Sequence, residues 1–494
     1  MNLDTQVTTA LQARLRDPSL LETRAWLASG WQEASGGRSF AVTNPATGEI
    51  LARVASLSGA EVESAITASA QAQAVWQRRS SHERAKLLRA WFDLMIANAD
   101  DLALIMTSEQ GKPLAEARGE ILYAASFVEW FAEEAKRIYG DVAPHPQTDK
   151  RILVIRQPVG VCAAITPWNF PAAMITRKVA PALAAGCSII VRPADLTPLT
   201  ALALAVLAER AGIPAGVLQV VCGPSREIGA VLTASPVVRK LSFTGSTEVG
   251  RVLMSQSSST IKRLSLELGG NAPFIVFDDA DLDAAIEGAM ASKYRNSGQT
   301  CVCANRFLVQ DGIYDRFVEA LVRRVAELKV GNGVEPGVQQ GPLIQKSACE
   351  HLQAMIDDAV GKGAKVVVGG KGHALGGTFF EPTVIAGATP DMHVAREELF
   401  GPVAPVFRFR DEAEAIALAN DTEYGLAAYL YTRDNARIWR VGEALEYGMV
   451  GLNTGLISNE VAPFGGVKQS GLGREGSRYG IDEYLEIKYL CAQV

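Results

Sequence analysis

The 494-residue chain has little of what marks several specialised protein classes. It contains only seven cysteines and five histidines, and its longest apolar runs, such as residues 201–208, are too short to span a bilayer. The cysteines lack the dense spacing of a disulfide framework, so free thiols are expected. The absence of a fixed-period repeat argues against solenoid and propeller folds. No metal site is predicted.

Charge and the N-terminal sequence exclude further classes. The formal net charge is −6, and the basic residues are mixed with acidic ones rather than clustered, which argues against a nucleic-acid partner. The first residues, Met-Asn-Leu-Asp-Thr, carry an acid where a secretory signal needs basic residues. We therefore expect a cytosolic protein without a membrane partner.

What the sequence does contain is a long alternation of strand and helix patterns, in a chain long enough for two or three domains. Amphipathic helices are predicted at residues 61–77 and 81–99, the second with Ser80 or Ser81 as its N-cap. From about residue 151, β-branched runs alternate with helices, which is typical of βαβ units around a parallel sheet. Strands are expected at residues 159–165, 188–191, 217–221, 273–277, 306–310, 365–368 and 403–409, and a helix at 199–211.

The fold class is therefore α/β, with two parallel-sheet domains that meet near Leu268-Gly269-Gly270. Residues 139–156 could form a protruding hairpin, and residues 484–492 could form a late strand. Either segment is a candidate for oligomerisation.

One cysteine stands in a context that suits a nucleophile. The segment Asn296-Ser297-Gly298-Gln299-Thr300-Cys301 places a thiol after small, turn-forming residues, where backbone amides could lower its pKa. A buried structural cysteine is the alternative, and this segment alone leaves the two interpretations open.

Two further segments contain polar groups that such a nucleophile would need. Glu267 lies in an apolar strand before a diglycine, and burial would raise its pKa towards that of a general base; a Glu paired with a cation is the alternative. Asn169 lies between Pro167 and Pro171 in a rigid loop, as a fixed oxyanion donor would.

A phosphate-binding turn is predicted at residues 243–250, where a strand ends in Thr244-Gly245-Ser246 and a helix begins. Taken together and in this order, the motifs from Thr166 to Glu475 resemble the aldehyde dehydrogenase superfamily, over nearly the whole chain. The resemblance implies a cofactor domain (residues 1–137 and 157–266), a catalytic domain (267–465) and an oligomerisation element (138–156 and 478–494), assembled as dimers or tetramers.

The resemblance also implies roles for individual residues. The nucleophile falls on Cys301, the general base on Glu267 and the oxyanion donor on Asn169, while Lys178 and Glu475 match a secondary proton relay. NAD or NADP would be bound by Thr166, Pro167, Trp168, Arg192, Asp195, Gly245, Ser246, Leu268, Glu398 and Phe400.

Within the superfamily, residues 300–306 and 457–470 are most similar to succinate-semialdehyde dehydrogenases. This similarity places Arg177, Arg295 and Ser458 around the distal carboxylate of a small semialdehyde substrate, with Phe170 and Phe464 lining its site. Arginine suits that role because its planar fork binds a carboxylate with two hydrogen bonds. Glutarate semialdehyde, one methylene longer, is the alternative substrate.

At the adenosine-ribose position this chain has Arg192-Pro193-Ala194-Asp195, whereas the family usually has Lys-Pro-Ala-Glu or Lys-Pro-Ala-Ser. Asp195 should repel a 2′-phosphate, which favours NAD, but Arg192 could attract it, which favours NADP. NAD is slightly favoured.

Other classes remain as alternatives. A cysteine hydrolase needs a histidine partner, and no histidine lies in a suggestive context. A CoA-acylating dehydrogenase would not need Glu267 as a base, and a non-catalytic role would leave the motifs unused. Cys303, two residues after Cys301, is either packing or a redox partner that forms a disulfide with it.

Overall fold

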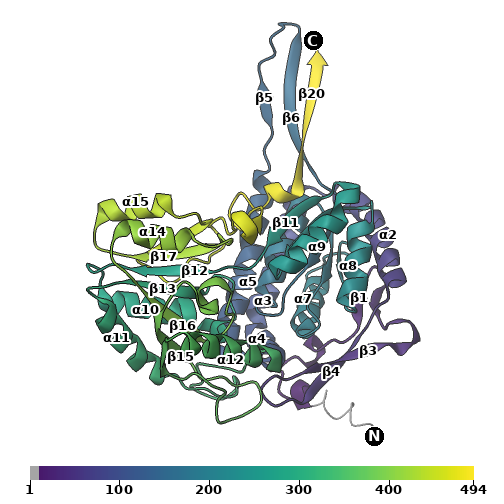
Figure 1. Ribbon diagram of the computed structural model, residues 1–494. Helices are drawn as coiled ribbons and strands as arrows, with labels where there is room; N and C mark the ends of the chain where they lie inside the picture. The colour runs from purple at the N-terminus through teal and green to yellow at the C-terminus, as the bar shows by residue number, and fades with distance from the viewer. Residues whose placement is uncertain (1–9) are drawn as a thin grey trace.

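The computed structural model describes residues 10–494. It contains two large sheets with helices on both faces, a two-stranded hairpin and a narrow three-stranded sheet that projects from the body of the molecule (Figure 1). The predicted α/β class with two parallel-sheet units is confirmed. The Met-Asn-Leu-Asp-Thr segment and the start of the predicted cofactor domain, residues 1–9, lie outside the described residues.

The first large sheet has eight strands in the order β19-β11-β10-β7-β8-β9-β1-β2. The five strands from β11 to β9 are parallel to one another. The bounds are β1 (Ala25–Leu27), β2 (Gly30–Gln32), β7 (Val161–Ile165), β8 (Ser188–Arg192), β9 (Leu218–Val220), β10 (Val238–Thr244), β11 (Arg263–Glu267) and β19 (Gly471–Leu472).

Both faces of this sheet are buried, because the side chains of each strand alternate between two hydrophobic cores. In β7, Cys162 and Ala164 face one core, whereas Val161, Ala163 and Ile165 face the other. The first core contains α6 (Ala173–Ala185) and α7 (Pro198–Arg210), backed by α3 (Ser81–Ala97), α4 (Ala99–Gln110) and α5 (Leu114–Glu134). The second contains α2 (Gly59–Trp76), α8 (Ser225–Ala234) and α9 (Thr247–Ser257).

Capping residues determine where the early helices begin. Ser80 and Glu83 form a reciprocal capping box at the start of α3, as the sequence predicts for Ser80. Ser58 and Glu61 form another at the start of α2, so this helix begins two residues before the expected position. The long helix α5 and the hairpin of β3 (Ser39–Thr43) and β4 (Ile50–Ala55) were not expected from the sequence.

The second large sheet has seven strands in the order β14-β15-β16-β13-β12-β17-β18, all parallel except β14. The bounds are β12 (Ala272–Val276), β13 (Ala304–Gln310), β14 (Lys365–Val368), β15 (Thr383–Ala388), β16 (Val403–Phe409), β17 (Ala427–Tyr431) and β18 (Met449–Leu452). One face packs against α10 (Leu282–Lys293) and α11 (Tyr314–Ala326). The other packs against α12 (Lys346–Gly361), α14 (Glu412–Asn420) and α15 (Asn435–Ala444), with the short α13 (His393–Arg396) nearby.

The chain passes from one large sheet to the other at the predicted diglycine. Strand β11 ends at Glu267 in the first sheet, and β12 begins at Ala272 in the second. Every predicted strand is present with its ends within two residues of the expected ones. The residue limits of the domains stay predictions.

The projecting sheet has the order β20-β6-β5 and consists of β5 (Asp141–Ala143), β6 (Lys150–Pro158) and β20 (Leu485–Gln493) (Figure 1). The predicted hairpin and late strand are thus both present, and they also pair with each other along their whole length, from Leu485 opposite Pro158 to Gln493 opposite Lys150. Among residues 10–494, no helix has the length and apolar character needed to cross a membrane.

Candidate active site between the two sheets

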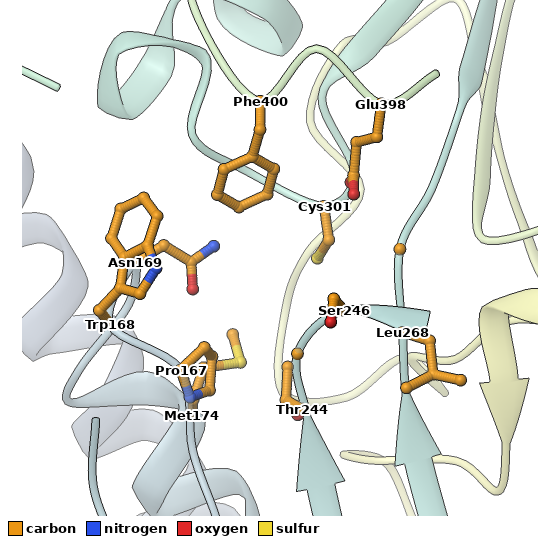
Figure 2. A pocket seen from close by; sticks show the side chains of 12 residues that line it. Pro167, Trp168, Asn169, Met174, Thr244, Ser246, Leu268, Cys301, Glu398 and Phe400 are labelled. Atoms are coloured by element: carbon orange, nitrogen blue, oxygen red, sulfur yellow. The ribbon is translucent and has the colours of Figure 1, made fainter. Parts of the chain in front are cut away.

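A cavity of about 230 Å³ lies at the carboxyl ends of β7 and β10, which are neighbours in the first sheet. From β7 the chain continues through β8 and β9 on one side, and β10 and β11 lie on the other. This reversal is the position at which open α/β sheets bind their ligands. The cavity is lined by Pro167, Trp168, Asn169, Met174, Thr244, Gly245, Ser246, Leu268, Gly269, Cys301, Glu398 and Phe400 (Figure 2).

Cys301 reaches this cavity from the second sheet, in the loop between α10 and β13. The loop turns sharply because Asn296 and Ser297 both have a φ of 52°. It also lies against the diglycine crossing, where a Cβ atom on Gly270 would come within 2.5 Å of the Cys301 carbonyl oxygen. Only glycine allows this close approach. The Cys301 sulfur and the Asn169 side chain face the same space (Figure 2).

The expected lowering of the Cys301 pKa is wrong for this structure. Burial raises the pKa of the thiol to about 12, and the Glu398 carboxyl raises it further, whereas the Arg177 guanidinium acts in the opposite direction. The sequence pattern identified the turn but not the loss of water around the sulfur, and that loss dominates.

Asn169 is held with one amide hydrogen available to a ligand. Its Nδ2 donates to the Gln299 carbonyl at 3.1 Å, and its Oδ1 accepts from the Phe170 backbone N–H at 3.1 Å. An amide nitrogen carries two hydrogens, so one remains after the bond to Gln299. The side chain can therefore donate to an oxygen in the cavity.

Glu267 ends β11 and is only 3% exposed. Neither of its carboxyl oxygens has a hydrogen-bond partner in the structure. Burial raises its pKa well above the usual value, and nearby Glu475 adds to this effect while Arg177 and Lys178 oppose it. The group is thus a desolvated carboxyl, as the sequence predicts, but it is not among the residues that line the cavity.

The predicted relay residues Lys178 and Glu475 lie together. The Lys178 ammonium is 2.5 Å from the Glu475 carboxylate and donates to the Thr244 hydroxyl at 2.6 Å. Burial opposes ionisation of Glu475, but Lys178 and Arg177 outweigh it and lower the pKa of that carboxyl. Because Thr244 lines the cavity, a hydrogen-bonded path runs from Glu475 to the cavity wall.

None of the predicted substrate residues lines this cavity, but Arg177 and Arg295 lie close enough to Cys301 to lower the pKa of its thiol. The buried Arg177 pairs with Glu475 at 2.8 Å, and its guanidinium lies 3.8 Å from the centre of the Phe464 ring. The half-buried Arg295 lies 5.3 Å from the centre of the Phe170 ring. Ser458 is half-buried in the loop after β18.

Most of the predicted cofactor residues gather on the cavity wall, namely Pro167, Trp168, Gly245, Ser246, Leu268, Glu398 and Phe400. Trp168 and Phe400 meet edge to face with ring centres 5.6 Å apart, across the opening in Figure 2. Burial raises the pKa of Glu398 to about 7, although the Gly270 N–H that it accepts at 3.1 Å opposes this. Thr166, Arg192 and Asp195 lie outside the cavity wall.

Arg192 and Asp195 bind each other. The Arg192 guanidinium is 2.5 Å from the Asp195 carboxylate and also donates to the Gly223 carbonyl. The side chain of Arg192 is 6% exposed, whereas that of Asp195 is 44% exposed. The attraction of a 2′-phosphate expected from Arg192 and the repulsion expected from Asp195 therefore come from one ion pair. Its carboxylate is the more exposed partner.

Cys301 and Cys303 are both free thiols. Cys303 is buried, and its sulfur donates to the Lys293 carbonyl at 3.1 Å. A bridge to Cys301 would require the loss of this hydrogen bond. The redox pairing stays a prediction.

The residues around the cavity fit a dinucleotide cofactor. A Cβ atom on Gly245 would lie 2.4 Å from the Phe243 ring, so glycine keeps the backbone accessible between β10 and α9. Ser246 caps α9, and the Thr166 hydroxyl is buried without a partner. Three lining residues were given no site role from the sequence, namely Met174, Thr244 and Gly269. Thr244 and Gly269 could have been found, because each is next to a predicted cofactor residue, Gly245 or Leu268.

Comparisons with known proteins agree with this geometry. The model of the aldehyde dehydrogenase family matches residues 31–490. A glutarate-semialdehyde dehydrogenase of Pseudomonas aeruginosa is 64% identical, with 97% of this chain and 99% of that protein covered. An NADP⁺ succinate-semialdehyde dehydrogenase of Escherichia coli is 61% identical, with the same coverage.

The crystal structure of a succinate-semialdehyde dehydrogenase from Burkholderia pseudomallei superposes with a TM-score of 0.97. It is 64% identical, and the match covers 97% of this chain and all of that one. The chain belongs to the aldehyde dehydrogenase family.

Proposed function

We propose that the protein oxidises a small semialdehyde with a distal carboxylate to the dicarboxylate, with NAD⁺ or NADP⁺ as the hydride acceptor. Succinate semialdehyde is the first candidate and glutarate semialdehyde the second. The observation that supports this best is the shared cavity: the Cys301 sulfur and the Asn169 amide face each other across it, next to the proposed nicotinamide site.

In the proposed reaction, the Cys301 thiol loses its proton to water, and its sulfur attacks the aldehyde carbon and forms a thiohemiacetal. The remaining Asn169 N–H donates to the oxygen that gains negative charge, in a cavity where little water competes. NAD(P)⁺, when bound, would supply the hydride acceptor, and loss of the hydride from the aldehyde carbon would leave a thioester on Cys301.

Glu267 then removes a proton from the water that hydrolyses the thioester, which releases the acid and restores the thiol. Glu475 raises the pKa of Glu267, so the two carboxyl groups are electrostatically coupled. Lys178 and Glu475 provide the way out for that proton, through their contact with Thr244. For each semialdehyde and each water consumed, the products are one dicarboxylate, one reduced cofactor and two protons.

The charges near the sulfur support a substrate with an acidic tail. Arg177 and Arg295 both lie close enough to Cys301 to lower the pKa of its thiol. Arg177 has a buried Nη2 that finds no hydrogen-bond partner among residues 10–494. A carboxylate could satisfy this donor, whereas an apolar aldehyde would leave it unpaired.

A hydrolase is less well supported. The five histidines, all in the described part of the chain, do not line the cavity that contains Cys301, so a histidine base is missing from its wall. Glu267 also argues against a CoA-acylating enzyme, in which the thioester is passed to a thiol rather than to water.

Initial rates with a panel of aldehydes test the proposal. We expect succinate and glutarate semialdehyde to be oxidised with much higher kcat/KM than butanal or pentanal, which match them in length without the carboxylate. The measurement is the absorbance of reduced nicotinamide, with NAD⁺ and NADP⁺ in parallel. Equal efficiencies for acidic and neutral aldehydes would reject a dicarboxylic semialdehyde as the substrate.

Arg295→Ala should weaken binding of the acidic tail. Truncating one side of a buried charge pair costs roughly 2–5 kcal/mol, or about 30-fold and upwards in KM for succinate semialdehyde. The KM for butanal is the control and should change little. Parallel changes for both substrates would mean that Arg295 supports the fold around Phe170 rather than the substrate.

For the cofactor, we propose a preference for NAD⁺, because the carboxylate of the Arg192–Asp195 pair is the more exposed partner. Asp195→Ser should free Arg192 for a 2′-phosphate and raise the ratio of NADP⁺ to NAD⁺ efficiency by roughly tenfold or more. Asp195→Asn is the control that keeps the shape but not the charge, and it should shift the ratio in the same direction. A constant ratio in both variants would place the pair away from the ribose.

We also propose that the projecting sheet joins subunits into a homo-oligomer. Its strands expose several large apolar side chains, which monomers rarely leave in water: Val142, Leu153, Ile487, Tyr489 and Leu490. The number of subunits and the cytosolic location stay predictions.

A further inference from the structure

A buried ion pair lies beside the proposed oxyanion donor, outside the groups that react. Lys112 lies between α4 and α5, and its ammonium contacts the carboxylate of Glu120 on α5; both side chains are 1% exposed. No local sequence pattern predicts this pair. Burying two charges costs their solvation free energy, and further contacts of the two side chains can offset this loss.

Those contacts hold the segment that begins with Asn169. The Lys112 ammonium donates to the Asn169 carbonyl oxygen at 2.8 Å. The Glu120 carboxylate accepts the backbone N–H groups of Ala172 and Ala173, at 2.9 and 3.2 Å. The pair therefore fixes both ends of residues 169–173, at the start of α6.

The same network reaches the Cys301 loop. Gln110 accepts the Lys112 backbone N–H at 2.9 Å and donates to the Asn296 side chain at 3.0 Å. Asn296 in turn donates to the carbonyl oxygens of Asn169 and Gln299, at 3.0 and 3.1 Å. The Asn169 carbonyl oxygen thus accepts two hydrogen bonds. One comes from Lys112, on the side of the first sheet, and the other from Asn296, in the loop that precedes Cys301.

We infer that the Lys112–Glu120 pair is a positioning device that sets the Asn169 amide against the Cys301 sulfur. Lys112 acts through the Asn169 main chain, because its ammonium is already engaged by Glu120, by the Asn169 carbonyl and by the Phe170 ring, whose centre is 4.0 Å away. The inference rests on the proposed role of Asn169. It predicts a loss in the chemical step, with aldehyde binding preserved.

A double-mutant cycle separates positioning from general support of the fold. Lys112→Met should lower kcat by roughly 10- to 100-fold with KM within about threefold, and Asn169→Ala should lower kcat by roughly 10²–10³-fold. If Lys112 works through Asn169, the double variant should have the kcat of Asn169→Ala within about threefold. Losses that multiply in the double variant would overturn the inference, and so would full kcat in Lys112→Met.

Lys240→Met is the matched control. Lys240 is also buried and ion-paired, 3.3 Å from Glu483, but it contacts Ser265 rather than Asn169. Its loss should lower the melting temperature by a similar amount and leave kcat within about threefold of the parent. An equal fall in kcat for Lys240→Met would mean that any buried lysine has this effect.

Lys112→Met leaves Glu120 buried and unpaired, so the neutral variant Lys112→Met/Glu120→Gln is tested beside it. This variant keeps an acceptor for the α6 amides and should show the same fall in kcat at higher stability. Restored kcat in the neutral variant would reject positioning by Lys112. Full kcat in Asn169→Ala alone would instead reject the oxyanion role on which the inference rests.

Discussion

Cys301→Ala should lower kcat for semialdehyde oxidation by at least about 10³-fold, because no other group in the cavity can form the covalent intermediate. Among the lining residues it supplies the sole thiol. The measurement is steady-state formation of reduced nicotinamide at saturating aldehyde. Cofactor binding, followed by protein fluorescence, should stay close to that of the parent.

Cys303→Ala is the matched control for this substitution. It removes a thiol two residues away that donates to the Lys293 carbonyl rather than facing the cavity, so most of the activity should remain. If activity survived in Cys301→Ala and disappeared in Cys303→Ala, the nucleophile would be Cys303 and not Cys301.

Glu267→Gln should separate the two halves of the reaction. The thioester should still form, because Cys301 and Asn169 are intact, but its hydrolysis should slow by roughly 10²–10⁴-fold without the base. Rapid mixing should then show one equivalent of reduced nicotinamide per active site, followed by a slow steady state. A slow first turnover without this burst would mean that Glu267 acts in a step before the thioester forms.

The pH dependence of thioester hydrolysis should also differ between the parent enzyme and Glu267→Gln. Burial raises the pKa of Glu267 well above its usual value, and a base works only in its ionised form, so hydrolysis in the parent enzyme should accelerate as pH rises through that pKa. The slow phase of Glu267→Gln should lose this rise, since glutamine does not titrate.

The positions of many strands along the chain were predictable, because each is a short apolar run between turn residues. Their order within the sheets was not predicted. Local signals also limited the cap of α3 to Ser80 or Ser81, and the structure has Ser80, which forms a capping box with Glu83. The pairing of β6 with β20 was not predictable, since it joins segments more than 300 residues apart that carry no complementary pattern. Helix α5, which packs against α3, α4 and α6 in the first core, was missed.

For the site, the sequence indicated which residues lie close together but not how their surroundings change the pKa values of their side chains. Cys301, Asn169 and Glu398 do line one cavity. The raised thiol pKa depends on burial by residues from both sheets, which no local window contains. The Arg192–Asp195 pair was treated as two independent side chains, although a spacing of three residues allows direct contact.

The crossing at Gly270 means that the reacting atoms belong to two separately packed bodies. Asn169 is attached to the eight-stranded sheet, and Cys301 precedes a strand of the seven-stranded one. A small rotation of one body against the other would separate them while every helix and strand stayed intact. In mild denaturant, catalysis is therefore a finer indicator of native structure than circular dichroism, and it should disappear first.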